Sequence, residues 1–226
     1  MLNKENLIKY FEDGITDKGY EKIGTEHEKF VFNKNDYSLI PYRGEQSISA
    51  LLESFIQDDW KPKYEGDNII ALTKENASIT LEPGGQFELS GSPLVTIHET
   101  CREINNHLQF VKSIEEKMNI GFLGVGFLPI EKLDVVPHVP KKRYSEIMRP
   151  YMKKLGGLGL DMMHRSCTVQ ANFDYISELD MKKKIMVSAA LQPIVTGLFA
   201  NSPFLEGQLN GFQSYRGYVW TKTDND

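Results

Sequence analysis

Four glutamate side chains stand at spacings that suit metal and phosphate chemistry: Glu26, Glu28, Glu82 and Glu88. The first two are two residues apart in IGTEHEKFVF, and the last two flank a Pro-Gly-Gly turn. Side chains two residues apart on a strand point to the same face, so converging strands would bring the four carboxylates together. Unpaired carboxylates would raise one another's pKa values, and a divalent cation would remove that cost. Oxygen-rich sites suit Mg²⁺ or Mn²⁺, and because Mg²⁺ usually also bridges substrate phosphates, ATP is the natural co-substrate.

The segments on either side of the Pro-Gly-Gly turn alternate between polar and apolar residues. Apolar residues take the odd positions from Ile79 to Leu89, and polar residues take the even positions from Ser78 to Ser90. This alternation predicts two strands whose polar face carries one carboxylate each. It is also typical of solvated strand carboxylates, so the pattern alone leaves a metal site and an ordinary exposed surface both open.

No protein nucleophile is apparent in the sequence. There is no Ser/His/Asp or Cys/His arrangement, and the five histidines lack metal-ligand spacing. The segment GFLGVGF is not a Walker loop, since no Gly-Lys-Ser/Thr follows, and Pro129 follows where a dinucleotide fingerprint needs a helix. We interpret its glycines as allowing close packing or ligand approach in a strand.

The elements that must position the glutamates follow from periodicity. Period-two patterns predict strands at 23–32, 68–73, 77–82, 86–90, 121–127 and 167–174. Helical spacing predicts helices at 3–13, after Ser47, after Ser92-Pro93, at 143–155 and at 178–200. The first helix would bury Leu7, Ile8, Tyr10 and Phe11, and the third a stripe from Ile97 through Cys101 to Met118. The short turns favour a largely antiparallel α+β sheet with helices on one side.

Composition limits the class of protein. The chain has 226 residues, of which 40% are hydrophobic and 25% charged, which is typical of a globular domain. Its net charge of −5 argues against non-specific nucleic-acid binding. Two cysteines indicate a reducing compartment. Neither a leader-like segment nor an apolar run of about 20 residues is visible, so we expect a soluble, cytoplasmic protein with no membrane partner.

From about residue 20 onward, the sequence resembles the glutamate–cysteine ligase family, in its plant and proteobacterial type. The segments that carry the resemblance are TEHEKF, ITLEPGGQFELSG, TCREINNHLQFVK, NIGFLGVGF, LGGLGLDMM, CTVQANFDY, ALQPIVTGLFANSPF and WTKTD. The run LEPGGQFELSG, followed by a helix of the form TCxExNxHL, is a long and specific signature.

The resemblance implies a fold like the glutamine-synthetase catalytic domain and an ATP-dependent ligase of glutathione biosynthesis. In that family ATP phosphorylates the side-chain carboxylate of L-glutamate. The amine of L-cysteine then attacks the acyl phosphate and gives γ-glutamylcysteine. Magnesium ions held by glutamates on the sheet neutralise the phosphates. Such chemistry needs no protein nucleophile, in agreement with the sequence.

The resemblance also implies roles for particular residues. It makes metal and ATP ligands of Glu26, Glu28, Glu82 and Glu88. Arg143 of KKRY and Arg216 of SYRGYVW match catalytic arginines that bind substrate carboxylates and developing phosphate charge, for which the planar guanidinium is suited. The amino-acid pocket would be lined by Thr168, Gln170 and Asn172, with Arg165 as a further candidate.

Some features depart from the family pattern. The segment RYSEIM has one more residue than the RY-x-IM of plant sequences, and family members are much longer than this chain. We therefore expect residues 1–226 to be the N-terminal part of a single catalytic domain, as a fragment or an incomplete gene, with apolar surface exposed. Cys101 matches a regulatory-disulfide cysteine of plant members, and we expect a plain buried thiol. Two alternatives stay open: a ligase for another amine acceptor, and a truncated nucleotide-binding chain without turnover.

Overall fold

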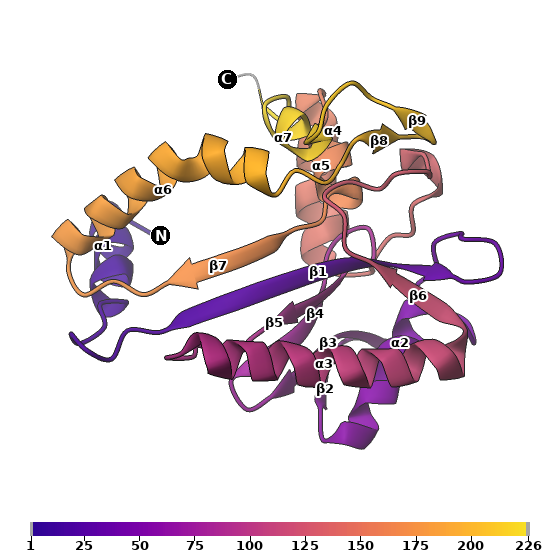
Figure 1. The fold of residues 1–226 in the computed structure, drawn as a ribbon, viewed down its shortest axis with the longest axis horizontal. Helices are drawn as coiled ribbons and strands as arrows, with labels where there is room; N and C mark the ends of the chain where they lie inside the picture. Colours follow the sequence, from indigo (N-terminus) through magenta and orange to yellow (C-terminus); the bar gives the residue numbers. More distant parts are fainter. Residues whose placement is uncertain (1, 225–226) are drawn as a thin grey trace.

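Figure 1 shows a computed structural model of the chain, which describes residues 2–224. Its centre is a seven-stranded antiparallel sheet in the order β2-β3-β4-β5-β1-β6, with β7 pairing with a separate part of β1. The strands are β1 (Ile23–Asn33), β2 (Lys61–Glu65), β3 (Asn68–Lys74), β4 (Ala77–Leu81), β5 (Phe87–Ser90), β6 (Ile120–Leu123) and β7 (Val169–Phe173). The predicted α+β fold with a mostly antiparallel sheet is confirmed.

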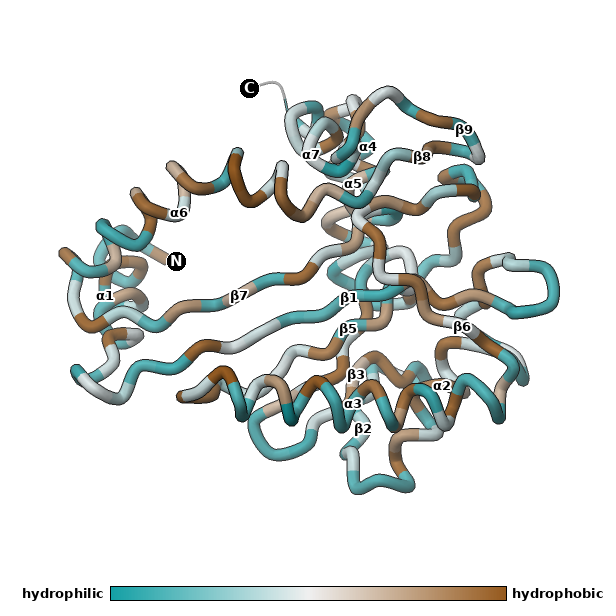
Figure 2. The backbone as a smooth tube through the Cα atoms, in the orientation of Figure 1, coloured by the Kyte–Doolittle hydropathy of each residue, from teal (hydrophilic) through white to brown (hydrophobic). Residues whose placement is uncertain are grey.

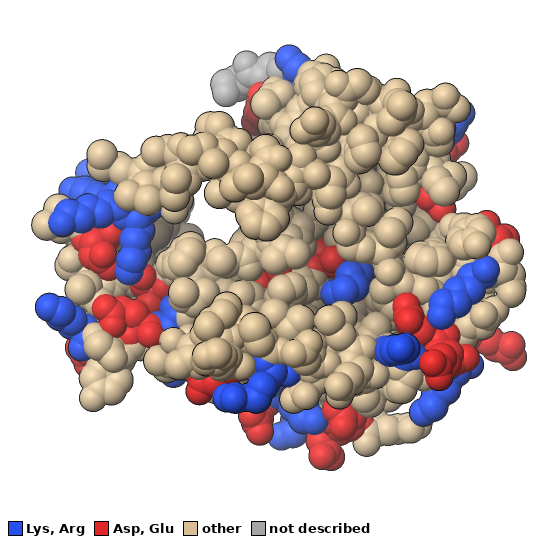
Figure 3. All heavy atoms as spheres, in the orientation of Figure 1, with Lys and Arg blue, Asp and Glu red and all other residues tan. Residues whose placement is uncertain are grey.

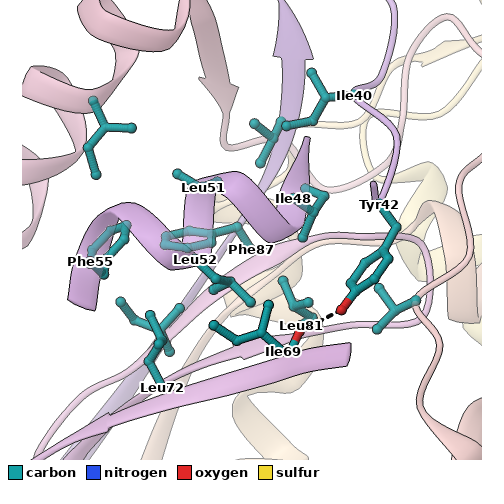
Figure 4. Close-up of a cluster of buried hydrophobic side chains, with 14 of the residues drawn as sticks. Ile40, Tyr42, Ile48, Leu51, Leu52, Phe55, Ile69, Leu72, Leu81 and Phe87 are labelled. Carbon is teal, nitrogen blue, oxygen red and sulfur yellow. Dashed lines mark hydrogen bonds between the residues drawn. The ribbon is translucent and has the colours of Figure 1, made fainter. Parts of the chain in front are cut away.

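Helices α2 (Ile48–Phe55) and α3 (Ile97–Met118) cover one face of this sheet (Figure 1). Ser47 begins α2 as predicted, because its hydroxyl accepts the backbone N–H of Ala50. Figure 4 shows the core between α2 and the sheet, where buried side chains include Ile48, Leu51, Leu52, Phe55, Ile69, Leu72, Leu81 and Phe87. This apolar layer supports the strands whose opposite face carries the glutamates.

Helix α3 begins later and buries a different stripe than predicted. Thr96 and Glu99 form a capping box, which satisfies the first backbone N–H groups and starts the helix at Ile97. The buried side chains are Thr100, His107, Val111 and Ile114. Stacking of His107 against Phe87, with ring centroids 5.9 Å apart, fixes this rotation. Val111 of the expected stripe is buried and Met118 packs against the core, but Ile97, Cys101 and Leu108 are exposed.

The remaining helices are not on the α2–α3 side, so the expectation of helices on one side is wrong for them (Figure 1). They are α1 (Lys4–Asp13), α4 (Arg149–Leu155), α5 (Gly159–Arg165), α6 (Glu178–Leu198) and α7 (Tyr215–Trp220). A π-helical turn, Arg143–Met148, runs directly into α4, and a small hairpin is formed by β8 (Phe204–Leu205) and β9 (Gln208–Leu209). A second, smaller buried cluster of Phe30, Leu128, Val136 and Cys167 lies on the face of β1 that also carries Glu28.

Helices α1 and α6 bury none of their residues. The inner face predicted for α1 is therefore wrong: its apolar side chains are exposed. Figure 2 shows hydrophobic residues along α6, and we define the α6 apolar surface as Ile185, Met186, Val187, Leu191, Ile194, Val195, Leu198 and Phe199. All residues of β7 are exposed as well. Within residues 2–224, no helix combines the length and hydropathy that crossing a membrane requires.

Candidate active site

Strand register aligns two of the predicted glutamates across the sheet. The Cα atom of Glu28 on β1 lies opposite that of Glu88 on β5, and Glu88 lies opposite Thr80 on β4. Residues opposite each other on neighbouring strands point to the same side, so these three polar side chains form one row. A second row two residues along β1 joins Glu26 to Ser90. Acidic atoms are visible in the recess between the upper helices and the α3 layer (Figure 3).

Glu88 is the most firmly held carboxylate of this row. Its side chain is buried, with 6% of its surface exposed. The Thr80 hydroxyl donates to one carboxylate oxygen at 2.9 Å, and the Ser90 hydroxyl donates to the other at 2.6 Å. Two hydroxyl donors compensate the loss of water around a buried carboxylate, so Glu88 is preset in one orientation.

The Glu28 carboxylate lies near other carboxylates, which repel it, and near an N–H and a guanidinium group, which attract it. Its Oε2 accepts the backbone N–H of Thr168 at 3.0 Å, in the segment that leads into β7. Burial first, and then repulsion from the Glu82 and Glu88 carboxylates, raise the pKa of Glu28 to about 8. The Thr168 N–H and the Arg216 guanidinium act in the opposite direction. A cation or a proton at this point would relieve the repulsion.

Glu82 lies just beyond the end of β4 and contacts residues that the sequence did not single out. The Tyr144 hydroxyl lies 3.3 Å from its Oε1, and Lys141 donates to the carbonyl of Leu81 at 2.8 Å. Burial, followed by the Glu88 carboxylate, raises the pKa of Glu82. Burial also lowers the pKa of the Lys141 ammonium. The one signal for these two residues was the KKRY motif, in which only the arginine was considered.

Glu26 is bound by a side chain of β7. Its Oε1 accepts from the side-chain amide of Asn172 on β7 at 2.8 Å, and Gln170 donates to Asn172 at the same distance. This chain of amides ties the predicted amino-acid pocket to β1. The structure thus brings Glu28, Glu82 and Glu88 into mutual electrostatic contact and leaves Glu26 at their margin.

The donor chemistry of this site fits a hard divalent cation, because carboxylate oxygens dominate it. Within the part of the chain that the structure describes, however, no three His, Cys, Asp or Glu side chains are grouped to hold a metal ion. The carboxylates of Glu28 and Glu88 instead accept the hydrogen bonds given above. A cation would have to displace some of them, and the metal centre stays a prediction.

The two predicted catalytic arginines interact with different carboxylates, Arg216 with Glu28 and Arg143 with Glu82. Arg216 is half-buried in α7, interacts with Glu28, and has an Nε atom without a hydrogen-bond partner. Arg143 is exposed in the π-helical turn, with its guanidinium 5.3 Å from the centre of the Tyr144 ring. Both guanidinium groups are therefore within the electrostatic reach of the acidic cluster.

Arg165 is occupied by the protein itself. Its guanidinium forms ion pairs with Asp161 at 2.9 Å and with Glu206 at 3.5 Å, and lies over the ring of Phe127. The side chain is buried, with 3% of its surface exposed. These contacts join α5 to the β8–β9 hairpin, whereas the Arg165 Nε and Nη2 atoms are buried without a hydrogen-bond partner. Substrate binding by Arg165 stays a prediction.

Comparison with known proteins identifies the family. Residues 22–226 match the family model described as glutamate-cysteine ligase family 2, and the chain belongs to this family. It is 54% identical to the chloroplastic glutamate–cysteine ligase of Medicago truncatula, over the whole of this chain and 44% of that protein. It is 53% identical to the enzyme of that name from Arabidopsis thaliana, over 42% of its length. The chain thus spans less than half the length of these curated relatives.

The names of these relatives contradict the expected cytoplasmic location. Both relatives are named chloroplastic, as is glutamate–cysteine ligase A of Oryza sativa subsp. japonica at 52% identity, which points to the chloroplast. The expectation rested on the lack of a leader-like segment. A targeting leader lies outside the folded part of a protein and is often cleaved off. The lack of a leader-like segment in this stretch therefore carries no information on location.

Proposed function

We propose that this chain contributes to the ATP-dependent ligation of the glutamate side-chain carboxylate to the amine of cysteine. The product would be γ-glutamylcysteine, formed through an acyl phosphate as the first step of glutathione biosynthesis. Membership of glutamate-cysteine ligase family 2 supports this proposal. The observation that carries it is the electrostatic contact of Glu28, Glu82 and Glu88 on one face of the sheet.

Glu28, Glu82 and Glu88, with Glu26 at their margin, are the residues that would hold Mg²⁺ or Mn²⁺ together with ATP. When bound, the cation would offset the charge of the phosphates. The chain's own contribution is to hold the carboxylates in place before any ligand arrives. Thr80, Ser90 and the Thr168 N–H do so through hydrogen bonds.

Arg216 and Arg143 are proposed to bind substrate carboxylate and phosphate oxygens. The unpartnered Nε of Arg216 supports this role, because a buried guanidinium donor favours a carboxylate or phosphate acceptor. Thr168, Gln170 and Asn172 would line the amino-acid pocket on the exposed face of β7. We further propose that residues 1–226 belong to a single catalytic domain with a fold like that of glutamine synthetase, which the antiparallel sheet supports.

Calorimetric titration of the 226-residue chain with Mg²⁺–ATP tests this assignment. Glu28→Gln and Glu88→Gln preserve side-chain shape but remove a ligand charge, and each should weaken binding about tenfold or more. Glu116→Gln, on the exposed face of α3, is the matched control and should bind as the parent does. Parent-like binding by both site variants would overturn the assignment.

Release of ADP that depends on both glutamate and cysteine tests the reaction itself. Replacing cysteine with 2-aminobutyrate in the same assay examines whether another amine acceptor is preferred. Binding of Mg²⁺–ATP without ADP release would favour a nucleotide-binding chain without turnover.

A further inference from the structure

The turn between β4 and β5 carries Glu82 at its start and Glu88 shortly after its end. Between them lies Gln86, whose side chain is 1% exposed. Its Oε1 accepts the backbone N–H of Gly84 at 2.9 Å, and its Nε2 donates to the carbonyl of Ser166 at 2.7 Å. One buried amide therefore connects this turn to the end of α5, 80 residues further along the chain.

The same junction has a second contact that only glycine permits. A Cβ atom on Gly84 would overlap the carbonyl oxygen of His164, which belongs to the backbone and has little freedom to move. The backbone of the turn and the backbone at the end of α5 thus touch directly. Gln86 and Gly84, which are hydrogen-bonded to each other, thus contact the same segment at two points.

The segment they touch leads directly to the hydrogen bond that holds Glu28. Ser166 is followed two residues later by Thr168, whose N–H donates to the Glu28 carboxylate. Glu82 lies beyond the last residue of β4, and Thr168 lies before the first residue of β7. Backbone hydrogen bonds continue the strand pairing to each residue, from the Glu82 N–H to the Gln86 carbonyl and from the Glu28 N–H to the Thr168 carbonyl. The Gln86 amide adds the link between these two strand ends.

We propose that Gln86 and Gly84 are positioning residues that fix Glu82 relative to the Thr168–Glu28 pair. They touch neither substrate nor phosphate and act through the backbone. The need for such a connection is electrostatic: three carboxylates repel one another, and an untethered turn would move Glu82 away from the others. The connection keeps the carboxylates close enough for one ligand to contact all of them.

This inference rests on the proposed function, because it assumes that the carboxylates bind a divalent cation. The test is titration of the full 226-residue chain with Mn²⁺ alone, with free Mn²⁺ measured by electron paramagnetic resonance. Gln86→Met keeps the length of the side chain but removes its hydrogen bonds. Gly84→Ala keeps the Gln86 residue but places a Cβ atom against the His164 carbonyl and the Gln86 Oε1, and so pushes the turn from α5. Each should weaken Mn²⁺ binding about tenfold, as loss of a ligand's supporting contacts typically does.

Gln46→Met is the matched control. Gln46 also connects distant backbone, since its amide donates to the carbonyls of Met118 and Asn119 and accepts from Asn33, at the other end of β1. Its loss should lower the melting temperature while leaving Mn²⁺ affinity unchanged. Comparing affinities at a temperature where all variants are folded separates positioning from general destabilisation. If Gln86→Met does not fold, Gln86→Asn retains the amide but is one methylene too short to reach both partners.

The outcomes are distinct. Failure of the parent chain to bind Mn²⁺, with no effect of Glu88→Gln, would overturn the proposed metal site itself. Binding by the parent that is lost in Glu88→Gln but retained in Gln86→Met, Gln86→Asn and Gly84→Ala would overturn the positioning role. An equal loss in Gln46→Met would show that any loosening of the sheet weakens binding, and would also overturn it.

Discussion

Burial and repulsion from neighbouring carboxylates both raise the pKa of Glu28. This raised pKa makes the stability of the fold depend on pH. The folded-state pKa of about 8 lies above the ordinary value of 4.5. Between these values the folded state holds a proton that the unfolded state has lost, so the free energy of unfolding falls as the pH rises. We predict that Glu28 contributes a decrease on the order of 2 kcal/mol from pH 5 to pH 8, measured by urea denaturation as the difference between the parent and Glu28→Gln. Burial lowers the pKa values of His107 and His164, so these two groups change the total stability in the opposite direction.

Glu28→Gln should remove this contribution, since the amide does not titrate. Glu82 should keep a contribution of the same sign, because its pKa is also raised. Glu116→Gln should leave the slope unchanged. The same change in stability from pH 5 to pH 8 in the parent and in Glu28→Gln would contradict the description of the Glu28 environment.

The residues of the site differ in how far the sequence could predict them. Glu28 and Glu88 were accessible, because period-two spacing fixes which side of a strand a residue faces. Lys141 and Tyr144 were not, since their partners lie some 60 residues away and no local pattern records that contact. The hydrogen bond of Glu26 to Asn172 on β7 could not be predicted, because no local pattern records a contact 146 residues apart.

Among the elements, the strands were predicted better than the helices. Strand β2 escaped prediction because KPKYE is polar and contains proline, as edge strands often do. The start of α3 was misplaced because Ser-Pro competes with the stronger Thr-x-x-Glu box downstream. The α+β class nevertheless followed from the alternating segments alone. The buried face of α3 could not be predicted in this way, because it depends on the stacking of His107 against Phe87.

The π-helical turn suggests how the extra residue of RYSEIM is accommodated. Tyr144 is buried at its start, the N–H of Arg149 bonds to the Tyr144 carbonyl, and the residues at 145–147 are exposed. A π turn adds one residue to a helix without rotating the helical turns after it. We predict that deleting Glu146 restores an ordinary α-helical turn and changes the free energy of unfolding by less than about 1 kcal/mol.

Deletion of Gln109 from the middle of α3 is the comparison for this prediction. It would rotate the later turns of α3 by a full residue and expose Val111 and Ile114, so a loss of several kcal/mol is expected. Both free energies come from urea unfolding. Similar losses in the two deletions would mean that the π turn has no such accommodating role.

At the scale of the whole molecule, the main feature is the exposed α6 apolar surface. A soluble monomer rarely exposes so long an apolar stretch, and β7 offers exposed strand residues below it. We predict that the 226-residue chain self-associates and binds a hydrophobic dye at micromolar concentration. Light scattering and dye fluorescence measure the two effects.

Met186→Lys and Leu198→Lys should reduce both signals without loss of stability, because neither side chain is buried. Ile147→Lys removes a similarly exposed apolar side chain away from α6 and should change neither. A monodisperse 25.8 kDa parent without dye binding would disprove the prediction.

The pairing of β1 with β7 has a consequence for the order in which the protein folds. Strands β2 to β5 follow one another closely in the chain and can pair by closing short loops. The hydrogen bond between Glu28 and Thr168 closes a loop of 140 residues, at a far greater cost in chain entropy. The meander can therefore form early, while Glu28 gains its partner only when the chain has nearly finished folding. A nascent chain would carry its carboxylates long before it could hold them in place.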